Sequence, residues 1–129
     1  MRNRRDRRVA LDAVTDAGSY SVTYQVSDFK YIVLDMASIA DSDQVVQVQG
    51  GMGDDYAPAT AQGVDNNWSY LYITDLATKT GYAGSVGATV SGAEYRKFSV
   101  DVDGMDYVSF HVSTGTAGAI TVGISGYSE

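Results

Sequence analysis

The C-terminal third of the chain reads Phe98-Ser-Val-Asp-Val-Asp-Gly-Met-Asp-Tyr-Val-Ser-Phe-His-Val112 and, after a short polar stretch, Ile120-Thr-Val-Gly-Ile124. In each run apolar residues alternate with polar or small ones, so that every second side chain falls on the same side of an extended backbone. This period of two is typical of a β-strand with one face in a core and the other toward solvent. The stretch therefore predicts three strands, over residues 98–102, 108–112 and 120–124.

The Asp103-Gly104 pair between the first two strands is a common turn signal. A two-residue loop there would put the apolar residues of the two strands on opposite faces. A three-residue loop, with Gly104 in the left-handed position of a bulge, pairs Phe98 with Val108 and keeps the apolar faces together. We therefore predict a bulged hairpin, the alternative being that the two strands belong to opposite sheets. A similar hairpin is expected around residues 114–118.

Four further segments alternate in the same way, over residues 20–26, 29–36, 44–49 and 68–74. The second carries apolar residues on both faces, which predicts a central strand covered on both sides. The glycine-rich residues 50–55 are expected to form a loop. Helical periodicity is poor, and a helix is considered only over residues 9–17 or briefly around Ile39. About seven or eight strands joined by Gly, Ser, Thr and Asp turns predict an all-β fold, an antiparallel β-sandwich or jelly roll.

Charge is segregated along the 129 residues. The first eight contain five arginines and one aspartate, a charge of +4, whereas residues 9–129 hold four basic and fifteen acidic residues, a charge of −11. The length supports one domain with a core of its own. We divide the chain into a flexible basic N-terminal arm and lead-in, residues 1–19, and a sandwich domain, residues 20–129. The absence of cysteine excludes disulfides, Cys-based zinc sites and thiol catalysis.

The arginines of the arm indicate a protein partner. They are Arg2, Arg4, Arg5, Arg7 and Arg8. They could contact phosphates, but the acidic body would repel a duplex, and the sheet lacks an RNA-binding motif, so we do not expect a nucleic-acid-binding domain. The sequence that follows is too interrupted by acids for a signal peptide, and no stretch is long and apolar enough to cross a membrane. We expect synthesis in the cytoplasm and no membrane partner.

Catalytic chemistry finds little support in the sequence. The single histidine, His111, lies on the polar face of its strand, and Ser109 and Ser113 stand roughly 6–7 Å from it at a spacing of two residues. The turn acids Asp101, Asp103 and Asp106 depart from a calcium loop in the position of their glycine, and whether they bind calcium stays open. We expect no enzyme and no cofactor.

Ten tyrosines and one tryptophan exceed what a small core needs. Such rings are favoured where one side is buried and a polar end meets water or a partner. Trp68, Tyr70 and Tyr72 alternate along one segment and are candidates for a subunit interface. The alternative is a platform on which sugar rings stack.

From the second strand onward the chain resembles small β-sandwich structural proteins of tailed bacteriophages. Four elements carry the resemblance: Val48-Gln-Gly50, the Asn-Trp-x-Tyr-x-x-Ile run at residues 67–73, the Gly-x-x-Gly loops at residues 81–87, and the final strands from Phe98 to Gly126. The resemblance implies a virion component without an active site, most often a capsid decoration or cement protein. It implies binding to the major capsid protein, to further copies of the chain, as in a trimer, or to both. A small tail or adaptor protein, or a receptor- or carbohydrate-binding module, is the alternative.

Overall fold

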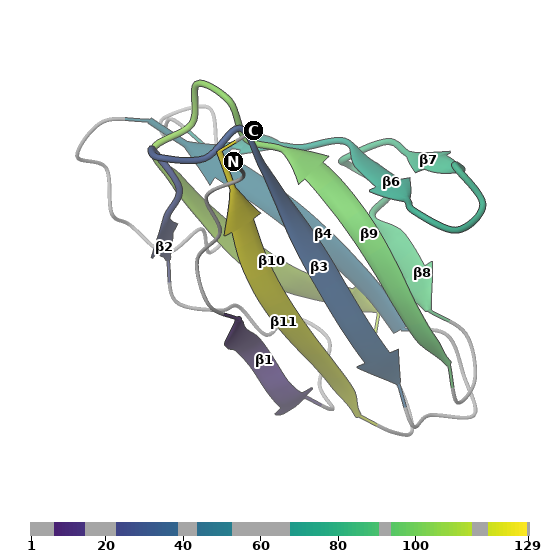
Figure 1. The fold of residues 1–129 in the computed structure, drawn as a ribbon. Coiled ribbons are helices and arrows are strands. Elements are labelled where there is room, and N and C mark those ends of the chain that lie inside the picture. The colour runs from purple at the N-terminus through teal and green to yellow at the C-terminus, as the bar shows by residue number, and fades with distance from the viewer. Residues whose placement is uncertain are drawn as a thin grey trace.

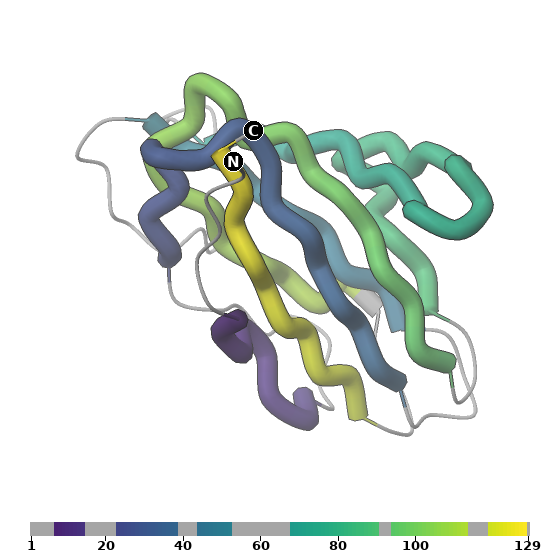
Figure 2. Tube along the Cα trace, viewed as in Figure 1, coloured from purple at the N-terminus to yellow at the C-terminus, as the bar shows by residue number. Residues whose placement is uncertain are grey.

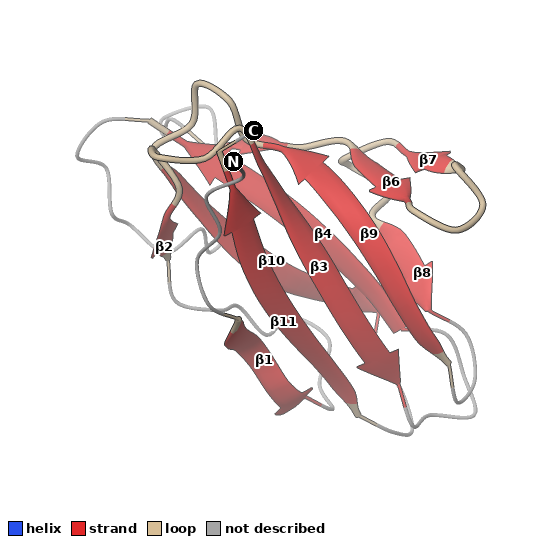
Figure 3. Ribbon diagram, in the orientation of Figure 1, coloured by secondary structure: helices blue, strands red, loops and turns tan. Residues whose placement is uncertain are grey.

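The computed structural model describes residues 7–14, 23–38, 44–52, 68–90, 94–114 and 119–128. Within these ranges the chain forms eleven strands in two antiparallel sheets, and no helix (Figures 1 and 3). The predicted all-β antiparallel sandwich is confirmed. The structure has more strands than the expected seven or eight. The strands over residues 8–14, 81–82 and 88–90 were not expected, and the one expected over residues 68–74 is divided in two. In the described ranges no helix exists that could cross a membrane.

Six strands form the first layer, called sheet A, in the order β1-β11-β3-β9-β6-β7. Their bounds are β1 Arg8–Val14, β3 Tyr31–Ser38, β6 Ile73–Asp75, β7 Gly81–Tyr82, β9 Tyr95–Asp101 and β11 Ile120–Tyr127. Sheet B holds the other five in the order β2-β10-β4-β5, with β8 also paired to β4. Their bounds are β2 Tyr24–Gln25, β4 Gln44–Gly51, β5 Ser69–Tyr70, β8 Ala88–Val90 and β10 Tyr107–Thr114.

The core lies between the two sheets and is built from the alternating apolar residues. Sheet A contributes Ile32, Leu34, Met36, Phe98, Val100, Ile120 and Val122; sheet B contributes Val46, Val48, Val108, Phe110 and Val112. Each is no more than 1% exposed. Two inward faces that each bury every second residue are the arrangement expected of a sandwich.

The predicted hairpin between the strands of residues 98–102 and 108–112 is wrong, and the alternative is correct. β9 belongs to sheet A and β10 to sheet B. The turn closes with the Met105 N–H donating to the Val102 carbonyl at 2.9 Å, and Gly104 has a φ of +91°. This short turn cannot pair the two apolar faces within one sheet, so the chain crosses to the other sheet, where both faces meet the same core. β10 and β11 also lie in opposite sheets, so the second predicted hairpin is wrong too.

Two segments differ from the predicted boundaries around Trp68. The strand expected over residues 68–74 is split into β5 in sheet B and β6 in sheet A. Gly50 and Gly51, expected to be loop, are the last residues of β4. A methyl group on Gly51 would lie 3.0 Å from the Trp68 ring, and one on Gly50 would lie 2.9 Å from Leu71 Cδ1. The glycines are therefore strand residues that leave room for these two side chains.

The start of the described chain is a strand rather than a helix. β1 pairs with the edge of β11, beside which it lies in Figure 2, with two register shifts and a φ of +50° at Ala13. Only Leu11 of this strand is buried. Residues 8–14, which we assigned to the arm and lead-in, thus form part of sheet A.

Candidate interaction surface

The outer face of sheet A carries side chains that the core does not use. Along β3, Tyr31 and Val33 point outward and are half-buried. The prediction that both faces of this strand are buried is therefore wrong at these two residues. The register places Tyr31 beside Asp101 of β9 and Tyr127 of β11. The two tyrosine rings stack with their centroids 5.1 Å apart and 9° between their planes.

Asp35 also lies on this outer face of β3, but it is buried because Arg7 covers it. The Arg7 Nε and Nη2 atoms donate to the Asp35 carboxylate over 2.6–2.9 Å, and Asp35 is only 8% exposed. Gly123, the neighbour of Asp35 on β11, leaves the space, since a Cβ there would overlap the Arg7 guanidinium. The hydrogen bond to Asp35, and then its charge, raises the pKa of Arg7. One arginine of the predicted arm is thus bound to the chain's own sheet.

The other arm arginines are placed differently. Arg8 begins β1 and is exposed. Arg2, Arg4 and Arg5 lie outside the described residues.

We expect Gly123→Ala to displace Arg7 and to lower the free energy of unfolding by about 1 kcal/mol, because Asp35 loses its partner. Arg7→Gln should cost a similar amount. The double variant should cost no more than either single one, since both remove the same contact. Urea unfolding of the four proteins measures this, and additive costs would contradict the assigned role of Gly123.

A shallow groove of about 570 Å³ crosses the outer face of sheet A. Its floor is formed by Thr74 of β6 and Ser99 of β9, which are register partners. Tyr31 lines it on β3, and Tyr72 lies over β7. Two carboxylates, Asp101 and Asp103, and one ammonium, Lys30, also line the groove. It therefore combines aromatic rings with charge, mostly negative.

The three predicted aromatic residues do not share one surface. Trp68 is 2% exposed and packs on Gly51. Tyr70 is half-buried, and Tyr72 is 60% exposed. Tyr72 is placed by Gly81, where any Cβ would overlap the Tyr72 hydroxyl. Only Tyr72 of the three offers a freely accessible ring.

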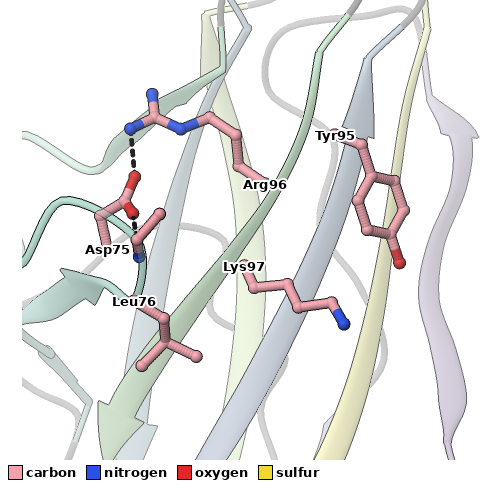
Figure 4. A pocket seen from close by; sticks show the side chains of 6 residues that line it. Asp75, Leu76, Tyr95, Arg96 and Lys97 are labelled. Carbon is pink, nitrogen blue, oxygen red and sulfur yellow. Dashed lines mark hydrogen bonds and ion pairs between the residues drawn. The ribbon is translucent and has the colours of Figure 1, made fainter.

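A second hollow of about 440 Å³ lies near the other end of β9, at residues 95–97, and is shown in Figure 4. Arg96 turns from β9 toward Asp75, while Lys97 and Tyr95 extend the other way across sheet A. Arg96 Nη2 bonds to Asp75, and Arg96 Nη1 donates to the Thr89 carbonyl of β8 at 3.3 Å. This arginine therefore links both sheets.

The Asp75 carboxylate is hydrogen-bonded within the fold by two backbone N–H groups and by Arg96. Burial alone would raise its pKa, but the N–H groups of Thr78 and Ala77, at 3.1 and 2.8 Å, and the Arg96 guanidinium outweigh it and hold the pKa below its ordinary value. The Arg96 guanidinium also lies over the Phe98 ring, with its carbon 5.5 Å from the ring centroid. The pair was not anticipated from the sequence.

The turn acids are engaged locally. The Asp103 N–H donates to Asp101 Oδ1 at 2.9 Å, the bond of an Asx turn. In the parts of the chain that are described, no three His, Cys, Asp or Glu side chains gather as metal ligands would.

His111 contacts an amide of the neighbouring strand. Its Nδ1 lies 2.9 Å from Gln47 Oε1, while Gln47 Nε2 donates to the Ser85 carbonyl at 2.7 Å. The second bond fixes the orientation of the amide, so His111 Nδ1 must carry the proton it donates. Burial lowers the pKa of His111. The contact orients the ring as part of the sheet B surface.

Protonation of His111 should destabilise the fold. The pKa of His111 in the folded protein lies below the unfolded value of 6.5, so the unfolded state takes up the proton first. The stability that the neutral ring contributes is therefore fully present above pH 6.5 and is lost as the pH falls toward the folded pKa. The slope contributed by one group is at most about 1.4 kcal/mol per pH unit. We expect His111→Gln to flatten the unfolding free energy between pH 6.5 and 5. An NMR titration midpoint at or above 6.5 would contradict the assignment.

Comparison with solved structures shows a similarity of fold. No protein-family model matches the sequence, and no curated protein matches it. The fold is similar to the crystal structure of the SPBc2 prophage-derived protein YomS, with a TM-score of 0.71 and 14% sequence identity. The alignment covers 99% of this chain and 96% of that one. At this identity the similarity concerns the fold.

Proposed function

We propose that the chain is a structural protein of a tailed-bacteriophage particle, namely a capsid decoration protein that binds the major capsid protein and stabilises the head. The observation that carries the proposal is the similarity of fold, over nearly the whole of both chains, to a prophage-derived protein. The sequence resemblance to small β-sandwich virion proteins supports the same origin.

The surface chemistry supports a protein that works by contact. A cysteine-free sandwich folds in a reducing cytoplasm without needing oxidation. The arginine-rich start and the acidic remainder give each copy two segments of opposite charge. Such segments guide association and fix its orientation. In this proposal the protein bridges capsid subunits non-covalently, alone or as a small cyclic oligomer.

Co-sedimentation with DNA-free heads of the phage that encodes the chain tests the proposal. We expect saturable binding in a fixed ratio to the major capsid protein, and a higher temperature of head disruption. Binding to isolated tails but not to heads would support a small tail or adaptor protein instead. Binding to neither would overturn the proposal.

A charge-matched pair of variants tests the part played by the arm. Arg4→Gln with Arg5→Gln should weaken head binding at least tenfold at 50 mM salt. Lys79→Gln with Lys97→Gln removes the same charge from exposed positions of the body and should leave the affinity nearly unchanged. Equal effects of the two pairs would remove the arm from the proposal.

The carbohydrate-binding alternative requires Trp68, Tyr70 and Tyr72 to form one exposed aromatic platform. Trp68, its largest ring, is buried on Gly51. Stacking of a sugar requires an accessible ring face, which leaves Tyr72 alone among the three residues.

A further inference from the structure

We propose that the groove between Tyr31 and Tyr72 receives the arginine-rich N-terminal residues of a second copy of this chain. The inference deepens the proposed function, and rests on it for the premise that copies of the protein assemble. The charge pattern indicates that the arm of one copy contacts the body of another, and the groove specifies where on the body this contact lies.

The sandwich already holds two arginines by carboxylates, and one of the two also lies over an aromatic ring. Arg7 is bound by the Asp35 carboxylate on the same outer face of sheet A. Arg96 is bound by the Asp75 carboxylate with the Phe98 ring at 5.5 Å. Guanidinium groups favour this combination of a carboxylate and an aromatic face. In the groove, the same combination is open to solvent.

The groove residues are held in place before any ligand arrives. Tyr31 is stacked on Tyr127, and Tyr72 lies in space that only glycine at position 81 leaves free. Asp101 is fixed by the N–H of Asp103 and stands beside Tyr31 in the register. Rings and a carboxylate that are already ordered bind a guanidinium without a further ordering cost.

The charge of this end of the sandwich suits a basic segment. The turns that contain Lys30 and Val102 are joined, since the Val102 N–H donates to the Lys30 carbonyl at 2.9 Å. These turns and the adjoining strand end carry four carboxylates and one ammonium. The carboxylates belong to Asp28, Asp101, Asp103 and Asp106. Residues 1–5, with Arg2, Arg4 and Arg5, have the opposite charge.

Geometry favours the arm of another copy over the chain's own. β1 is separated from β9 by β11 and β3, which is three strand spacings, or about 14 Å. At 3.3–3.6 Å per residue, the crossing would use about four of the six residues that precede Arg7. Arg5 would then be left over β11, and Arg4 would reach only the β3 edge of the groove, where Tyr31 lies. A second copy can bring all three arginines to one groove.

A contact between the arm of one copy and the groove of the next joins two different surfaces. Repeated around an axis, such a contact closes a ring in which every arm and every groove is used. Suppose that one variant lacks the arm's arginines and another lacks the groove's side chains. In a mixed pair, the arm of the second can still bind the groove of the first, and no further contact is possible, so assembly should stop at a dimer.

Two full-length variants test this in sedimentation velocity at 50 mM salt. The first carries Arg2→Gln, Arg4→Gln and Arg5→Gln; the second carries Tyr72→Ala, Asp101→Asn and Asp103→Asn. We expect the wild-type protein to form a closed oligomer that dissociates at 500 mM salt. Each variant alone should associate at least tenfold more weakly. An equimolar mixture should form a one-to-one dimer.

A control variant carries Asp12→Asn and Glu94→Gln, which remove two exposed carboxylates away from the groove; it should assemble like the wild type. Far-UV circular dichroism and urea unfolding verify that all variants are folded. A monomeric wild type, an unaffected groove variant, or a mixture that stays monomeric while the wild type assembles would each overturn the inference. Because no heads are present, these outcomes leave the capsid-binding test of the proposed function independent.

Discussion

Trp68→Ala is expected to lower the free energy of unfolding by about 3–5 kcal/mol, the cost of removing a buried indole and leaving a cavity. Trp68 is 2% exposed, and it packs on Gly51 at the end of β4. If the ring instead served as an open platform for a ligand, its removal would cost almost nothing. Urea denaturation followed by far-UV circular dichroism measures the difference.

Tyr72→Ala is the matched control, because this ring is 60% exposed. Its replacement should change the unfolding free energy by no more than about 0.5 kcal/mol. Trp68 is the only tryptophan, so acrylamide quenching of the native protein reports on it alone and should be weak. Strong quenching with an unchanged stability of Trp68→Ala would contradict the buried position.

Arg96→Leu is expected to cost about 3–5 kcal/mol, because it leaves the Asp75 carboxylate buried without its cation. Asp75 is 1% exposed and retains only the N–H groups of Ala77 and Thr78. The variant also loses the bond from Arg96 to the Thr89 carbonyl, which joins the sheets. Urea unfolding at pH 7 gives the magnitude.

The pH dependence separates a buried charge from a simple loss of packing. In the wild-type protein the pKa of Asp75 is below its ordinary value of 3.8, so its contribution is present above that pH and is lost only in stronger acid. Without Arg96, burial raises this pKa, and the carboxylate takes up a proton at a higher pH. The difference between wild type and Arg96→Leu should shrink as the pH falls from 7 to 4.

Lys97→Leu, at the exposed neighbouring position, should lie within about 0.5 kcal/mol of the wild type. Adding Asp75→Asn to Arg96→Leu should restore part of the lost stability, because no buried charge remains. A cost that is independent of pH and unchanged by Asp75→Asn would show that packing, not charge, explains the loss.

The strands could be predicted from sequence because alternation is a local property. The segments predicted over residues 98–102, 108–112 and 120–124 lie in β9, β10 and β11, except that β9 ends one residue earlier, at Asp101. Their assignment to sheets depends on where the opposite face of the core lies, which alternation does not encode. The parity of the Asp103-Gly104 turn did contain this information, because a loop that cannot pair two apolar faces in one sheet must carry the chain to the other.

The contacts made by the charged side chains of the candidate surface were largely not predictable. Asp35 lies in an apolar strand, and nothing local shows that Arg7, 28 residues earlier, binds it. Arg96 did leave a signal, since it shares the parity of Phe98 and Val100 and so faces inward. A charged residue at such a position requires a buried partner. Identifying Asp75 as that partner still needed the pairing of β6 with β9.

The alternation of consecutive strands between the sheets also determines how the chain reaches its fold. β9, β10 and β11 follow one another along the chain, yet none pairs with the next. No local hairpin of this region can therefore form early and guide the rest, and each pairing must wait for the closure of a long loop. We expect slow folding, on a scale of milliseconds to seconds. Because none of the three strands is paired with the next, none can leave the fold together with its neighbour in sequence. This arrangement favours slow unfolding.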